Sequence, residues 1–278
     1  ARLLGPSEYG ILTSIISILF ITGAVTGTIQ ITVTKYASVY HAEENTGKIR
    51  TFFLSTTKGM LISTIIVFII IMIFKNKIAS FLNLELTYSI IFLGVILIEG
   101  SIISIGRGVL QGMKKFRSLG INAILEVVLK ISLGVILVLL GFKASGAIFG
   151  FLLATLISYF FIFPSVRKIL AKRETSKNID RIDIKKIYKS TFFILISTIL
   201  LSLISYTDIV LVKHFFTSYE TGYYSAAAQI GRIILFFPGA VGIVVFPRLT
   251  EKKTKNENPK STLLKSFLII LIVSSIFY

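Results

Sequence analysis

Residues 61–74, LISTIIVFIIIMIF, carry no charge and present no polar face. They belong to a longer apolar run at 52–74, and a run near 20 residues can cross a hydrocarbon core about 30 Å thick. Such a run has to be helical in lipid, because a helix satisfies its own backbone hydrogen bonds. This stretch therefore predicts an all-α membrane protein.

Comparable apolar runs recur along the whole chain. Hydrophobic residues make up 54% of it and charged residues 15%, and the mean hydropathy is +0.85. Soluble domains have about 25% charged residues. We therefore expect an all-α polytopic membrane protein with about eight transmembrane helices. The predicted spans are residues 9–35, 52–74, 88–111, 119–141, 144–164, 187–213, 222–246 and 263–278.

Lysine and arginine gather in every second loop between these spans. The loops after the first, third, fifth and seventh spans are basic, whereas the alternate loops hold few cations. The positive-inside rule predicts that the basic loops face the cytoplasm and that residue 1 lies outside the plasma membrane. The net charge of +17 follows from this topology, so we expect no nucleic-acid partner.

Both ends of the chain suggest a larger protein. A first residue on the outside calls for a preceding span, and the last apolar run has 16 residues, about 24 Å of helix. We therefore expect a fragment of a transporter-like protein. The basic stretch 165–186 divides it into an N-terminal lobe (1–164), a cytoplasmic linker (165–186) and the start of a C-terminal lobe (187–278).

A turn near the start of the chain has a second copy. LLGPSEYG (3–10) and FFTSYETG (215–222) align at an offset of 212 residues, which matches Glu8 with Glu220 and Gly10 with Gly222. The following spans share Gly-Ala-Val, in ITGAVTG (21–27) and FPGAVGI (237–243). Such parallel repeats, related by an axis along the membrane normal, are a known plan of transporters.

With these motifs the chain resembles the multidrug/oligosaccharidyl-lipid/polysaccharide flippase superfamily, in its polysaccharide-export, O-antigen-flippase-like branch. In that family an LGPxEYG turn joins the first two helices, and a helix ending in Asp-Ile-Val-Leu followed by a Glu-x-Gly-x-Tyr turn opens the second lobe. The matching stretches here are YTDIVLVKHFF (206–216), ETGYYSAA (220–227) and FFPGAVGIVVFPRL (236–249).

The resemblance implies a two-lobed transporter of about 12 to 14 helices around a central cavity, working by alternating access. The present spans would be helices two to nine. It further implies a non-enzymatic flippase, without a cofactor, for a lipid-linked oligosaccharide or polysaccharide precursor on an isoprenoid phosphate or pyrophosphate carrier. Membrane lipids and candidate glycan assembly enzymes complete the expected partners.

Ionisable residues inside spans are candidates for the substrate site, because burying them in lipid is costly. Arg232 is the first candidate for the anionic head group, since a guanidinium binds phosphate bidentately. Glu99 could pair with Arg232, or carry a coupling proton or cation. The full set for the central cavity is Arg232, Glu99, Lys130, Glu126, Lys58 and Arg107.

Structural explanations compete at several of these positions. Glu126 and Lys130, four residues apart, could simply neutralise each other. Lys58 and Arg107 lie toward the cytoplasmic ends of their spans, where long side chains reach water. Pro238 and Gly239 suggest a hinge or a static bend within the seventh span, and Asp208 a structural hydrogen bond. With no cysteine and two histidines, we expect no metal site.

Other functions remain open at this point. A cation-coupled multidrug exporter of the same superfamily would favour acidic residues in the cavity. A polyprenyl-phosphate-dependent glycosyltransferase or polymerase would need clustered acidic residues for a metal or a general base, and neither DxD nor DDxxD occurs in the sequence. A non-functional gene fragment is the third alternative.

Overall fold

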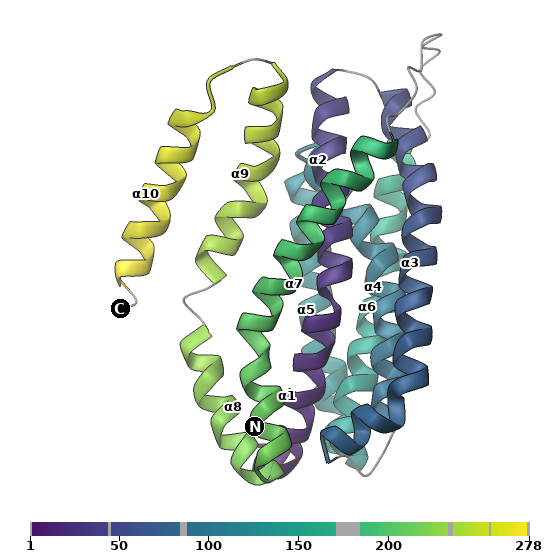
Figure 1. Cartoon of the computed structure of the whole chain (residues 1–278), viewed down its shortest axis with the longest axis vertical. Helices are drawn as coiled ribbons and strands as arrows, with labels where there is room; N and C mark the ends of the chain where they lie inside the picture. The colour runs from purple at the N-terminus through teal and green to yellow at the C-terminus, as the bar shows by residue number, and fades with distance from the viewer. Residues whose placement is uncertain are drawn as a thin grey trace.

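The computed structural model describes residues 2–43, 46–83, 88–170, 184–232, 236–255 and 257–276, and no strand occurs among them (Figure 1). The elements are α1 (Gly5–Thr22), α2 (Ala24–Ala42), α3 (Thr46–Phe81), α4 (Tyr88–Gly112), α5 (Phe116–Leu137), a π-helical turn at Val138–Phe142, α6 (Lys143–Leu170), α7 (Ile184–Phe215), α8 (Ser218–Arg232), α9 (Phe236–Thr254) and α10 (Lys260–Ile276). The predicted fold class, an all-α polytopic membrane protein, is confirmed.

Five of the described segments are long and apolar enough to cross a membrane. They are Gly5–Thr22, Arg50–Phe81, Tyr88–Gly112, Phe116–Arg167 and Ile187–Phe215. The fourth is a hairpin of α5 and α6 that reverses near Gly141, whose φ of +92° suits a residue without a side chain. The predicted linker falls largely on residues 171–183, outside the described part of the chain.

The first predicted span is divided between two helices, and the seventh includes residues 233–235, which lie outside the described part of the chain. The division of the first span falls at Gly23, between α1 and α2. In the seventh, α8 ends at Arg232 and α9 begins at Phe236. Pro238 is the third residue of α9 as the structure describes that helix. A hinge at Pro238 and Gly239 stays a prediction.

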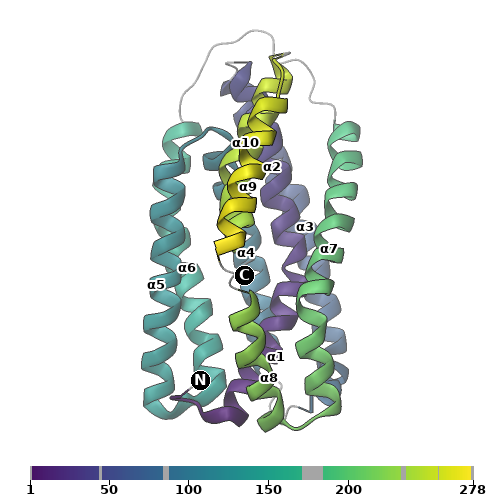
Figure 2. The same ribbon diagram turned by 90° about the vertical axis from the view of Figure 1, so that its left-hand side faces the viewer.

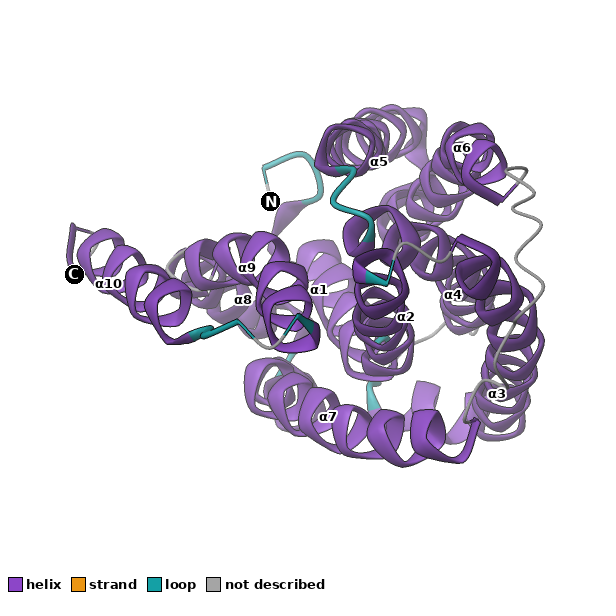
Figure 3. Ribbon diagram, turned by 90° about the horizontal axis from the view of Figure 1, so that it is seen from above, coloured by secondary structure: helices purple, strands orange, loops and turns teal. Residues whose placement is uncertain are grey.

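The helices pack as a bundle with a side layer. Helices α2 to α6 pack together, α7 runs along α1 and α2, and α8 and α9 lie beside α1 and α2, with α10 against α9 (Figures 2 and 3). The end where α2, α4, α6 and α9 terminate is called the basic end, because the basic loops follow these helices. The other is called the opposite end.

Two apolar clusters hold the bundle, one toward each end. The cluster toward the basic end contains Val33, Phe52 and Val109, and that toward the opposite end contains Leu12, Ile15 and Leu93. Large aliphatic side chains remain exposed along α3 and α5, among them Ile73 and Ile124. A soluble protein rarely exposes such continuous apolar surface, so these faces are suited to lipid.

The two copies of the repeated turn contact each other at the opposite end. A Cβ on Gly10 would lie 2.1 Å from the backbone oxygen of Ser218, and a Cβ on Gly222 would lie 2.1 Å from that of Pro6. The offset of 212 converts one contact into the other, and the Thr13 hydroxyl donates to Ser225 Oγ, its own counterpart, at 2.9 Å. The repeat detected in the sequence is therefore also a symmetrical contact between α1 and α8.

The close approach of these helices predicts a stability effect of Gly222→Ala. The added methyl group would overlap a backbone carbonyl, so α8 has to move away from α1, and overpacking of this kind costs about 1–3 kcal/mol. Thermal unfolding in detergent should show a lowered midpoint. Gly231→Ala in the same helix has open space around its Cβ and should leave the midpoint unchanged or raised. Equal effects of the two variants would contradict the close contact.

Candidate functional site

A cavity of about 480 Å³ lies at mid-depth, between the levels of the two apolar clusters. Residues of α1, α2, α4, α5, α6 and α7 line it. Among its polar lining residues are Gln30 on α2, Arg107 on α4, Glu126 and Lys130 on α5, and Tyr206 on α7. The cavity therefore lies between the bundle and α7, and charged groups reach it from the bundle side.

Arg107, Glu126 and Lys130 form one ionic cluster in this cavity. Glu126 Oε2 accepts from Arg107 Nη2, and Glu126 Oε1 pairs with Lys130 Nζ. The side chains of Arg107 and Glu126 are 16% and 9% exposed, whereas that of Lys130 is 30% exposed. Two cations share one carboxylate, so the cluster has a net positive charge, and Lys130 is its accessible member.

Polar residues that the sequence reasoning missed hold the cluster in place. Asn122 Oδ1 accepts from Arg107 Nε at 2.8 Å and from Nη2 at 2.7 Å, and Asn122 Nδ2 donates to the Ser158 carbonyl oxygen at 2.8 Å. Asn122, Glu126 and Lys130 are spaced by four residues, which puts them on one stripe of α5. That spacing, in an otherwise apolar span, was the available signal for Asn122.

A second cavity, of about 420 Å³, adjoins the first along α2, since Gly27 and Gln30 line both. This second cavity lies between α9 on one side and α2 and α4 on the other. Gln111 Nε2 donates to the Ile243 carbonyl oxygen of α9 at 2.9 Å, and Gln30 Nε2 donates to Gln111 Oε1 at 3.0 Å. These hydrogen bonds join α9 to the bundle on the basic side of the central cavity.

An ion pair reinforces this contact at the basic end itself. Lys114, just after α4, pairs with Glu251 of α9, and Lys255 lies 3.2 Å from the second oxygen of the same carboxylate. The hydrogen bond from Lys114 is the main reason why the pKa of Glu251 is lowered. The carboxylate is thus ionised at neutral pH and holds the two segments together.

Arg232 does not line the central cavity. Its Nη2 lies 2.7 Å from both carboxylate oxygens of Asp208, and its guanidinium stacks over the Tyr206 ring, 5.1 Å from the ring centroid. Tyr206 itself is one of the residues that line the cavity. The expected pairing of Arg232 with Glu99 is therefore replaced by a pair with Asp208. Asp208, for which we expect a structural hydrogen bond, accepts from Arg232.

Glu99 and Lys58 lie away from the cavity lining. Glu99 is on α4 with its Oε2 buried and without a hydrogen-bond partner, a state shared by Nη1 of Arg232. Lys58 is exposed on α3. The predicted set thus divides: Arg107, Glu126 and Lys130 come together, whereas Glu99, Lys58 and Arg232 lie apart from them. The described residues contain no group of three or more histidine and acidic side chains able to hold a metal ion.

Comparison with known proteins gives one match. The family model for polysaccharide biosynthesis proteins matches residues 1–253. No curated protein and no solved structure matches the sequence. The family match covers α1 to α8 and nearly all of α9, so it includes both cavities and both copies of the repeated turn.

Proposed function

Because the chain belongs to the polysaccharide biosynthesis protein family, we propose that it is a membrane flippase for a lipid-linked oligosaccharide or polysaccharide precursor. The family membership supports a flippase-like role in polysaccharide biosynthesis. The ionic cluster in the central cavity is the single observation that carries the finer proposal. In it Arg107 and Lys130 receive the phosphate or pyrophosphate of the carrier lipid.

The charge of the cluster favours a phosphate ligand. Arg107 and Lys130 outnumber Glu126, and the lysine ammonium, being the most exposed group, can turn from the carboxylate to an incoming anion. Charge-assisted hydrogen bonds to phosphate are about twice as strong as neutral ones. A cavity built for drug cations would instead leave acidic groups unneutralised.

The contacts at the two ends of the cavity support alternating access. Toward the opposite end, α8 closes on α1 through Gly10 and Gly222; toward the basic end, α9 closes on the bundle through Gln111 and the Lys114–Glu251 pair. We call these two contact regions the α1–α8 seam and the α9 seam, and in our proposal they open in turn. The positive-inside rule puts the basic end in the cytoplasm, so the α1–α8 seam opens outward.

Glu99 is the proposed coupling residue. Glu99 Oε2 is buried without a hydrogen-bond partner, which makes the charged form of the carboxylate costly. Binding a proton or a cation from one side of the membrane removes this cost. When one seam closes and the other opens, the proton or cation would be released to the other side of the membrane. Its transport would thereby be coupled to the movement of the lobes.

The proposal predicts that Lys130→Met slows flipping by about tenfold or more, the effect of losing one charge-assisted hydrogen bond. The measurement follows a labelled polyprenyl-pyrophosphate-linked sugar in proteoliposomes containing equal amounts of each variant. Lys77→Met serves as control, because Lys77 is an exposed lysine of α3 outside the cavities.

Three results would count against the proposal. Wild-type protein that fails to flip the lipid-linked sugar would refute the substrate class. Export of a cationic dye by that same preparation would favour the multidrug alternative. If Lys130→Met flips as fast as Lys77→Met, the ionic cluster is structural rather than a phosphate site.

A further inference from the structure

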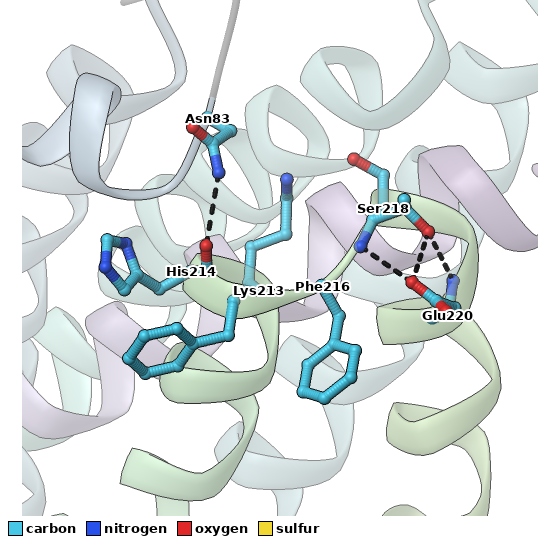
Figure 4. Close-up of a pocket in the computed structure, with 8 residues that line it drawn as sticks. Asn83, Lys213, His214, Phe216, Ser218 and Glu220 are labelled. Carbon is cyan, nitrogen blue, oxygen red and sulfur yellow. Dashed lines mark hydrogen bonds between the residues drawn. The ribbon is translucent and has the colours of Figure 1, made fainter.

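A buried lysine lines a separate cavity at the opposite end of the molecule. Lys213, near the end of α7, is 1% exposed. It lines a cavity of about 420 Å³ together with Asn83, after α3, and residues of the turn between α7 and α8 (Figure 4). None of these residues lines the central cavity. Cavities that hold small ligands begin at about 300 Å³.

The orientation of Lys213 is unusual for its position. Lysines near the ends of transmembrane helices normally extend to the surface, which keeps their charge in water. Lys213 instead directs its ammonium group into the space between Asn83 and Ser218 (Figure 4). Within the described part of the chain its Nζ has neither an ion pair nor a hydrogen bond. Burying a charged ammonium group without a partner costs free energy, and a bound anion would remove that cost.

Among the described residues of the lining, no group compensates the charge of Lys213. Glu220 is the acidic residue of the lining, but its Oε2 accepts from the Thr217 backbone N–H at 2.9 Å and from the Thr217 hydroxyl at 2.8 Å. This is a capping box at the start of α8, and the hydrogen bonds lower the pKa of Glu220. Because α8 begins at Ser218, the positive end of its dipole lies at the cavity and favours an anion further.

Two lining residues form a fixed wall. The His214 ring stacks on Phe81 with the ring centroids 4.0 Å apart, and its Nδ1 lies 2.8 Å from the Phe81 carbonyl oxygen. A carbonyl oxygen only accepts, so Nδ1 carries the proton. Asn83 Nδ2 donates to the His214 carbonyl oxygen at 3.4 Å. The end of α3 and the end of α7 are thereby tied together beside Lys213.

The surroundings of the cavity are those of a membrane interface. Phe215 and Phe216 in its lining are 72% and 55% exposed, and Tyr219 and Tyr223 are exposed in the first and second turns of α8. Exposed tyrosines at helix ends are typical of the lipid head-group level. An anionic head group could therefore enter from the lipid while its acyl chains contact the phenylalanine rings.

We propose that Lys213 and the cavity between α3, α7 and α8 bind a phosphate group, either that of a membrane phospholipid or free phosphate. This site is independent of the flippase proposal, because it involves neither the central cavity nor transport. An occupant here would contact the end of α3 and the start of α8 together.

Thermal unfolding of the full chain in a neutral detergent tests the site. The probes are short-chain phosphatidylglycerol below its micellar concentration, inorganic phosphate, and short-chain diacylglycerol, which lacks the phosphate. Wild type is compared with Lys213→Met, which keeps most of the length of the side chain, and with Lys77→Met as the exposed-lysine control. Phosphate ions also stabilise proteins in general, so the difference between variants is the result.

Without a probe, Lys213→Met should unfold at the same or a higher temperature than wild type, because it replaces an unpaired buried charge by an apolar group. A phosphate-bearing probe should raise the midpoint of wild type and Lys77→Met by a few degrees, and that of Lys213→Met by less. A response to the lipid alone identifies a head group, and a response to inorganic phosphate identifies the free ion. Equal shifts in wild type and Lys213→Met, or no shift in wild type, would overturn the proposal.

Discussion

A disulfide between Thr13→Cys and Ser225→Cys should reduce flipping to roughly a tenth of the wild-type rate or less, and a reductant should restore it. The two hydroxyl oxygens lie 2.9 Å apart, across the seam between α1 and α8, so the two side chains point toward each other, as a disulfide requires. In an alternating-access cycle this seam has to open once in each turnover. A covalent bond across it therefore stops the cycle in the state with the α1–α8 seam closed.

The chain offers a clean background and a matched control for this experiment. It contains no cysteine, so only the introduced pair can react, and maleimide labelling counts the thiols that remain free. Thr64→Cys with Ser101→Cys joins α3 to α4, where the hydroxyl oxygens are 2.7 Å apart. Both helices belong to the bundle, so this second disulfide should leave flipping intact. A fully oxidised Thr13–Ser225 pair that still flips would show that the seam does not open.

Arg107→Ala should give the largest loss of stability among the cavity variants. Glu126 would keep only Lys130, the more exposed of its two cations, and the loss of a buried hydrogen-bond partner costs about 1–3 kcal/mol. Here Asn122 also loses both of its hydrogen bonds from Arg107. Thermal unfolding in detergent should show a strongly lowered midpoint, with a correspondingly low yield of folded protein.

A double variant separates folding from phosphate binding. Arg107→Met with Glu126→Leu removes both buried charges, and apolar replacements of buried ion pairs are often neutral for stability. We expect the midpoint to return most of the way to that of wild type while flipping stays lost. Arg107→Lys keeps the charge but not the planar fork, so it should also flip poorly. Recovery of flipping in the double variant would make Arg107 a purely structural residue.

Hydropathy was sufficient to predict most of the helices. The predicted spans 88–111 and 187–213 correspond to α4 and α7 within three residues at each end. The break at Gly23 was not predicted, because Gly23 is followed by the apolar Ala24 and Val25 and a running hydropathy pattern does not change there. Hydropathy reports how apolar a segment is, and it is insensitive to a local division between two helices.

The candidate site was predicted in part. Arg107, Glu126 and Lys130 were recognised as charges within spans, and the i, i+4 pairing of the last two follows from helix geometry alone. Two further features depended on the packing of α4 against α5 and α6: Arg107 joins the pair, and Asn122 and Ser158 position it. Arg232 illustrates the same limit, since the turn between α7 and α8 brings Asp208 to it rather than Glu99.

The sequence by itself determined the class of protein, the course of the spans and the existence of the repeat. Each of these depends on residue type and spacing along one chain, which the amino-acid order records directly. Only the tertiary structure decided that Gly10 and Gly222 meet across the α1–α8 seam, and that Lys213 turns inward to a cavity of its own. Such contacts depend on how helices distant in sequence are rotated and packed against each other, so no spacing within one helix can predict them.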